Sequence, residues 1–157
     1  MEYFGSKPLR WNTLGLKYPG DAQSHLVIRV LDNANRYPWS MTFDWTTGPL
    51  AEGLRLYNTG EYFSAHESWE TVWLTAVEPE RTFLQGLIQV TAAFEHLKRN
   101  NNQLGASRLL THALRRLAPY SAGFGNIDVD LLRADLRDRL ASLATGTSPA
   151  PARILPL

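Results

Sequence analysis

The chain contains no cysteine among its 157 residues, which excludes disulfides, thiolate zinc sites and thiol chemistry. Neither sign of charge is in excess, because 16 Lys and Arg stand against 15 Asp and Glu, for a net charge of +1. The sequence also lacks an apolar run long enough to span a membrane and a glycine-rich phosphate loop. We therefore expect neither a nucleic-acid partner nor a membrane partner.

The N-terminus has no apolar segment after its first charged residues, so it is not a secretory signal peptide. At this length and with 44% hydrophobic residues, a single domain with a substantial core is expected. With no signal peptide expected and no cysteine in the chain, a cytoplasmic protein is the simplest interpretation.

Residues 1–47 differ from the rest of the chain because turn signals dominate and three of the five tryptophans lie there: Trp11, Trp39 and Trp45. We predict a mostly extended arm whose tryptophans pack on a helical body. Alternatively, the arm packs against a second copy of the chain and makes a homo-oligomer.

Residues 48–146 carry helical periodicity and helix stop signals, and they predict an all-α bundle of about five helices. The expected spans are about 49–57, 61–74, 78–99, 103–118 and 128–145. The third helix is apolar on almost every side, so it should be the central buried one. The tail 147–157 holds three prolines and cannot be helical throughout.

The most informative stretch is His66-Glu67-Ser68-Trp69-Glu70, one turn of the second helix. His66 and Glu70 fall in the apolar arc of that helix, where burying an unpaired polar group costs several kcal/mol, roughly. In the third helix Gln85, Gln89 and His96 form a polar stripe flanked by small residues. We predict that the stripe faces His66 and Glu70 and makes a buried polar seam between the two helices.

Four interpretations of this seam are open. It can be a structural hydrogen-bond network. It can be a divalent-metal site with His66, Glu70 and His96 as ligands, although the His-Glu-x-x-His and paired Glu-x-x-His spacings are missing. It can perform acid–base chemistry, with Glu70 or Glu67 as the base and His66 as its partner. It can bind a ligand without chemistry; the candidate contacts are Gln85, Gln89, Trp69 and Trp73. The missing metal spacings favour the structural network over an enzyme.

Two stretches of sequence resemble a known family. They are the segment from Tyr57 to Trp73, with its Ala-His-Glu-x-x-Trp-Glu-x-x-Trp pattern, and Gln85-Gly86-Leu87-Ile88-Gln89 followed by a histidine. Together with Gly105-Ala106, they are similar to the signature of a bacterial and archaeal domain-of-unknown-function family, number 309, over about residues 50–118. The resemblance implies an all-α bundle and no assigned activity.

A second functional class also fits part of the chain. The segment from Gly53 to Trp73 resembles one tetratricopeptide hairpin, a unit that binds partner peptides in arrays of about three repeats. Only this hairpin shows the pattern. Arg108, Arg115 and Arg116 form a basic face on the fourth helix, which we interpret as solvated surface.

Overall fold

Five α-helices follow one another in the computed structural model, which describes residues 43–157. A short 3₁₀ turn, η1, precedes the last helix. The helices are α1 Gly48–Asn58, α2 Tyr62–Trp73, α3 Glu80–Asn100, α4 Gln103–Leu117 and α5 Val129–Ala144, and η1 is Phe124–Asn126. The predicted all-α fold and its five helices are confirmed, each helix end lying close to the stop signal that predicted it.

Local chemistry explains where the helices end and begin. Gly60 closes the α1–α2 turn with φ +80°, and Asn101 follows α3 with φ 46°; both lie in the left-handed region that glycine and asparagine tolerate best. Asn102 and Asp128 then start α4 and α5, each side chain accepting a backbone N–H three residues further on. The turns are thus specified within the chain itself.

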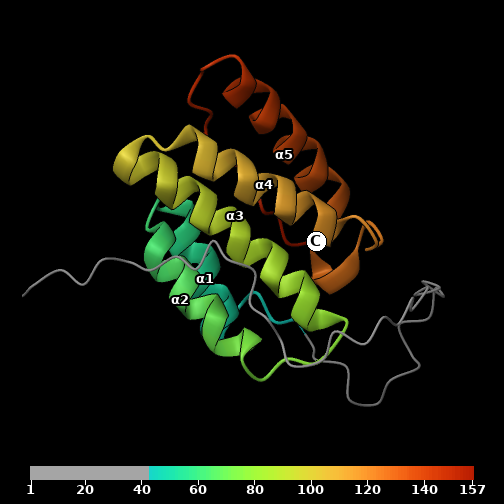
Figure 1. The fold of residues 1–157 in the computed structure, drawn as a ribbon. Helices are drawn as coiled ribbons and strands as arrows, with labels where there is room; N and C mark the ends of the chain where they lie inside the picture. Colours follow the sequence, from blue (N-terminus) through green and yellow to red (C-terminus); the bar gives the residue numbers. More distant parts are fainter. Residues whose placement is uncertain (1–42) are drawn as a thin grey trace, which may run out of the picture.

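Helix α3 is the centre of the bundle. It lies between α2 and α4, and each helix packs on the next one in the sequence (Figure 1). Thirteen of its 21 residues are buried. Gly86 lets α4 approach closely, because a Cβ at this position would lie only 3.0 Å from the Leu117 side chain. The prediction of a central buried helix is confirmed.

The tail crosses behind α3 and α4 and ends beside η1 (Figure 1). Ala152 and Ile154 are buried, and the Tyr57 hydroxyl donates to the Ala152 carbonyl at 2.7 Å. Asp135 of α5 accepts two hydrogen bonds from the Arg153 guanidinium, at 2.9 and 3.0 Å. The tail therefore contributes to the core without forming a helix.

Only residues 43–47 of the predicted arm belong to the part of the chain that the structure describes. Trp45 is buried, and its indole N–H donates to the Gly125 carbonyl at 2.7 Å. Trp11 and Trp39 lie outside the described residues, so the arm as a whole and the homo-oligomer stay predictions.

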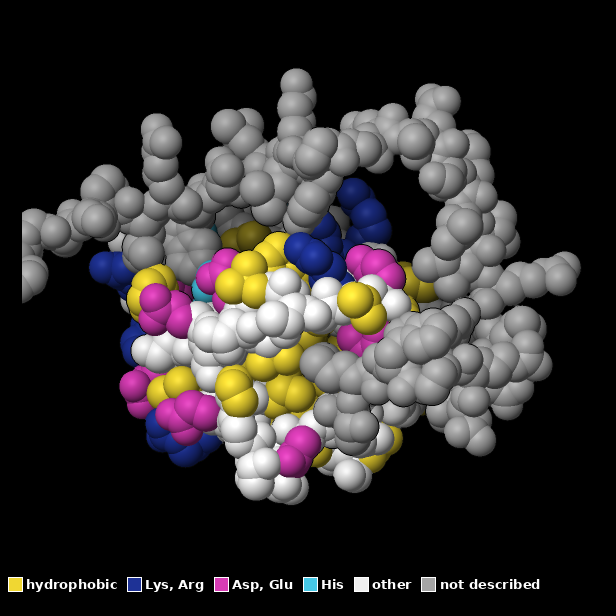
Figure 2. Space-filling model, turned by 90° about the horizontal axis from the view of Figure 1, so that it is seen from below, with side chains coloured by type: hydrophobic (Ala, Val, Ile, Leu, Met, Phe, Trp, Pro, Cys, Tyr) yellow, Lys and Arg dark blue, Asp and Glu magenta, His cyan; other side chains and the backbone are white. Residues whose placement is uncertain are grey.

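Within residues 43–157, no helix is both long and apolar enough to cross a membrane. Figure 2 shows hydrophobic side chains exposed between charged groups of both signs, on the face viewed from below. Leu74 and Val77, after the end of α2, are among the large hydrophobic residues that remain exposed. The hairpin predicted over 53–73 is present as α1 and α2, while its role in binding peptides stays a prediction.

Candidate functional site

His66 and Glu70 lie on one side of α2, with His66 Nδ1 3.8 Å from Glu70 Oε2. The His66 side chain is 17% exposed and that of Glu70 is 47% exposed, so the expectation that both are buried is wrong for Glu70. Burial lowers the pKa of His66, while the carboxylates of Glu70 and Glu67 oppose this shift. Glu67 itself is exposed.

Two residues of the α3 polar stripe form hydrogen bonds with residues of α4 or its cap. Gln89 Oε1 accepts from Arg116 Nη1 at 3.4 Å, and His96 Nδ1 lies 3.2 Å from the amide nitrogen of Asn102 at the start of α4. Burial lowers the pKa of His96, with the carboxylate of Glu95 opposing it. These two bonds join the stripe to α4, while the predicted seam between the stripe and His66 and Glu70 of α2 stays a prediction.

The five residues of the predicted seam are all partly buried, so the seam is not enclosed in the core. No group of three or more His, Asp or Glu side chains within residues 43–157 is arranged to hold a metal ion. His66 and Glu70 offer two neighbouring ligands, and a divalent-metal site that adds His96 stays a prediction.

Trp69 and Trp73, two of the predicted ligand contacts, have different surroundings. Trp69 is fully buried, and its indole N–H donates to the Leu50 carbonyl at 3.1 Å. Gly53 makes room for it, since a Cβ there would lie 2.2 Å from Trp69 Nε1. Trp69 therefore fixes the packing of α1 on α2, whereas Trp73 is partly exposed at the end of α2.

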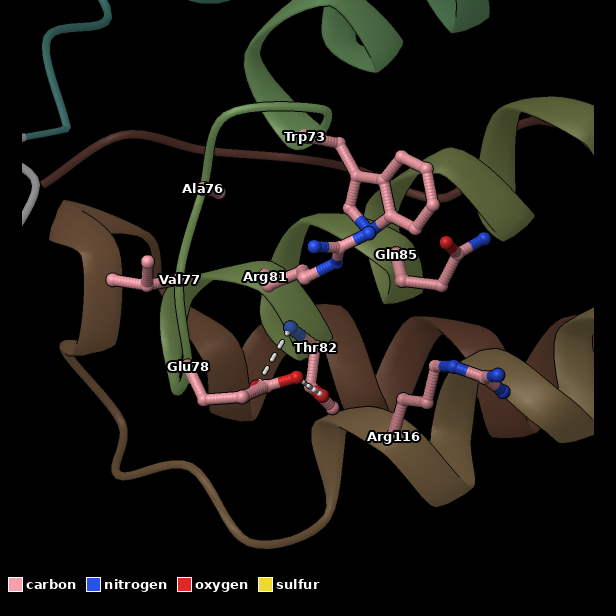
Figure 3. Close-up of a pocket in the computed structure, with 8 residues that line it drawn as sticks. All are labelled: Trp73, Ala76, Val77, Glu78, Arg81, Thr82, Gln85 and Arg116. Atoms are coloured by element: carbon pink, nitrogen blue, oxygen red, sulfur yellow. Dashed lines mark hydrogen bonds between the residues drawn. The ribbon is translucent and has the colours of Figure 1, made fainter. Parts of the chain in front are cut away.

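Trp73 and Gln85 meet at an open surface pocket of about 500 Å³ between the end of α2, the α2–α3 loop, α3 and α4. We call it the Trp73 pocket (Figure 3). Its lining residues come from three helices and one loop: Trp73, Ala76, Val77, Glu78, Arg81, Thr82, Gln85 and Arg116. Two of the residues predicted to bind a ligand, Trp73 and Gln85, thus line the same pocket. Gln89 is hydrogen-bonded to a third lining residue, Arg116.

Inside the Trp73 pocket the charged groups are held in place. The Arg81 guanidinium lies over the Trp73 ring, 4.5 Å from its centroid, which is a cation–π contact. Glu78 accepts hydrogen bonds from the backbone N–H of Thr82 at 3.2 Å and from its hydroxyl at 2.9 Å. The pocket therefore presents ordered guanidinium, amide and indole groups.

Neither arginine of this pocket was among the predicted ligand contacts. Arg81 precedes Gln85 by four residues, so the spacing of the polar stripe could have included it. Arg116 was interpreted as solvated surface together with Arg108 and Arg115; unlike those two exposed residues, it is only partly exposed. Its side chain turns toward Gln89, and nothing in the α4 sequence distinguishes it from its neighbours.

Comparison with known proteins identifies part of the chain. An uncharacterized protein of Aquifex aeolicus (strain VF5) is 33% identical over 101 residues, covering 64% of this chain and 30% of that protein. The matched part thus spans less than a third of that relative. The family model described as "Domain of unknown function (DUF309)" matches residues 50–109, which include Trp73, Arg81 and Gln85. Over these residues the chain is a match to DUF309, and the resemblance predicted from its motifs is confirmed.

Proposed function

We propose that this helical domain binds a small ligand in the Trp73 pocket. The observation that carries the proposal is that polar and aromatic side chains from α2, α3 and α4 line one open pocket of about 500 Å³, with Trp73, Arg81 and Gln85 side by side. Ligand sites in proteins are typically concavities of this size, about 300–1,000 Å³, with a few polar groups that orient the ligand.

The groups that line the pocket favour binding over acid–base chemistry. The one carboxylate in the lining, Glu78, already accepts two hydrogen bonds from Thr82. The His66–Glu70 pair belongs to the same helix as Trp73 but is not part of the lining. Guanidinium, amide and indole groups recognise ligands by hydrogen bonding and stacking. Retention of a ligand is therefore the function that the geometry supports best.

A thermal-shift screen of small polar and aromatic compounds tests this proposal. A compound that binds the folded chain raises its melting temperature. We expect at least one compound to do so for the wild type, and Gln85→Leu to abolish that shift, because the amide in the pocket is removed.

Gln103→Leu is the matched control, since Gln103 is a partly buried glutamine outside the pocket lining. It should respond to the same compound as the wild type does. The proposal fails if no compound stabilises the wild type, or if Gln85→Leu and Gln103→Leu respond alike.

A further inference from the structure

The Trp73 pocket contains two arginines whose charges no carboxylate balances in an ion pair. Arg81 comes from α3 and Arg116 from α4, and both are partly buried. The ion pairs among residues 43–157 include neither of them. Four other arginines, Arg55, Arg99, Arg133 and Arg153, pair with an Asp or Glu, whereas Arg108, Arg115, Arg137 and Arg139 belong to no ion pair within the described part of the chain. What distinguishes Arg81 and Arg116 is that they line the same pocket.

Resting on the proposed ligand-binding function, we propose that the ligand of the Trp73 pocket is an organic anion. Its carboxylate or phosphate group would lie between Arg81 and Arg116. A guanidinium offers a planar fork of N–H donors that matches both groups, and such charge-assisted hydrogen bonds are about twice as strong as neutral ones.

Each of the two guanidiniums has one described contact near the pocket. Trp73 supports Arg81 through the face of its ring. Arg116 donates one long hydrogen bond to Gln89, at 3.4 Å, which leaves most of its donors available. Because the Trp73 ring restrains Arg81, an anion bound there costs less conformational entropy than it would at a mobile surface arginine.

Glu78 does not cancel this charge. Its carboxylate accepts from Thr82 at the start of α3, and the pocket lining as a whole holds two arginines against this one acid. The residual positive charge favours an anionic over a neutral or cationic ligand.

The loop side of the pocket supplies an apolar surface. Val77 lines the pocket and is 53% exposed, and Ala76 lies beside it. Leu74, in the same loop, is 63% exposed. A ligand with an apolar group next to its anion would cover part of this surface, which is why we infer an organic anion instead of inorganic phosphate alone.

Titrations of the full chain with benzoate and with its neutral isostere benzamide test the inference. The readout is the indole ¹H–¹⁵N resonance of Trp73, assigned by its loss in Trp73→Phe. We expect benzoate to cause a saturable shift that weakens with added salt, and benzamide to bind at least about tenfold more weakly.

Single substitutions identify the groups responsible. Arg81→Gln and Arg116→Gln should each weaken benzoate binding by about tenfold or more, because each removes a charge-assisted contact. Arg108→Gln makes the same charge change at an exposed position of α4 and should leave the affinity unchanged. Circular dichroism of each variant confirms that it is folded, and two pocket variants keep the test decisive if one of them is not.

The outcomes separate the inference from the function on which it rests. If benzamide or another neutral compound binds as well as benzoate and both arginine variants keep full affinity, the pocket binds a ligand but the anion inference is wrong. The inference also fails if Arg108→Gln loses as much affinity as the pocket variants. If no compound, charged or neutral, shifts the Trp73 resonance, the function and the inference fail together.

Discussion

Trp69 and Trp73 lie four residues apart on the same helix, yet one belongs to the core and the other to a pocket. Trp69 is enclosed between α1 and α2, with Gly53 against its ring and its N–H bonded to the Leu50 carbonyl. Trp73 lies at the end of α2, where the chain turns into the exposed loop that leads to α3. The position of a tryptophan around its helix therefore does not decide whether it is buried. Its burial depends on which neighbouring element covers it.

The same contrast holds for the charges of the two regions. On the tail side, the buried carboxylate of Asp135 is matched by Arg153 in a bidentate pair. In the Trp73 pocket, Arg81 and Arg116 face no such carboxylate among the described ion pairs. Asp135 and Arg153 balance each other within the fold, whereas Arg81 and Arg116 leave positive charge in one pocket, and the proposed anion site rests on that difference.

The largest expected difference is between the two tryptophans themselves. Trp69→Ala should lower the free energy of unfolding by about 3–5 kcal/mol, because it removes a fully buried indole and leaves a cavity. Trp73→Ala should cost no more than about 1–2 kcal/mol, since part of its surface is already exposed. Urea denaturation of the two variants measures both values. Equal losses would show that the core and the pocket are not distinct regions.

The second prediction concerns the ion pair between Asp135 and Arg153. Asp135→Asn should cost about 1–3 kcal/mol at neutral pH, because Arg153 loses its ionic partner. Hydrogen bonds from Arg153 hold the pKa of Asp135 below its usual value. The contribution of the Asp135–Arg153 pair to the free energy of unfolding is therefore fully present above the unfolded-state pKa of Asp, about 3.9. It is lost as the pH falls through the lower folded-state pKa of Asp135.

Urea denaturation from neutral pH down to acid follows this loss, and the difference between wild type and Asp135→Asn should shrink below about pH 4. Two control substitutions test whether this stability loss is specific to Asp135. Glu52→Gln removes an exposed ion pair and Arg116→Gln removes an unbalanced charge, and each should change stability by less than about 1 kcal/mol. A cost at Arg116→Gln as large as that at Asp135→Asn would mean that the pocket arginine is structural.

The smallest effect concerns His66, which belongs to the same helix as both tryptophans. Burial lowers the folded-state pKa of His66. Its contribution to the free energy of unfolding is therefore fully present above the unfolded-state pKa of His, about 6.5, and is lost as the pH falls below that value. We expect His66→Gln to reduce the loss of unfolding free energy between about pH 7.5 and pH 5.5. A residual loss should persist, because burial shifts the pKa of His96 in the same direction.

Glu70→Gln sharpens this test. At neutral pH it should cost less than about 1 kcal/mol, because the side chain is half exposed. It also removes a carboxylate that raises the pKa of His66, so the acid-induced loss should become steeper. Urea denaturation curves at both pH values measure the slopes. If the free energy of unfolding falls equally between the two pH values in the wild type, His66→Gln and Glu70→Gln, protonation of the His66–Glu70 pair is not coupled to folding.

Much of the fold could be predicted because its signals are local. Pro49, Gly60, the asparagines before α4 and Asp128 mark helix ends through backbone conformation and capping, which need no distant partner. The apolar periodicity of α3 likewise predicted its central position. The two family motifs were read directly from the sequence, and the match to DUF309 over residues 50–109 confirms them.

The candidate site was predicted only in part, because it depends on how the helices pack. The periodicity of α3 correctly grouped Gln85 with Gln89, but it could not show that Gln89 reaches Arg116 on α4. Glu70 was expected to be buried, yet its side chain remains half exposed. Arg81 and Arg116 gained significance only when the structure placed them around one pocket.

The sequence by itself determined five helices, the turns between them, the central role of α3 and the resemblance to one family, since each depends on residues close together in the chain. The tertiary structure alone decided which of two tryptophans is enclosed, which arginines remain without an acidic partner and which helix the α3 stripe contacts. These outcomes depend on side chains from α2, α3 and α4 meeting in space. Periodicity gives the phase of a side chain around its helix, and only packing gives its neighbour.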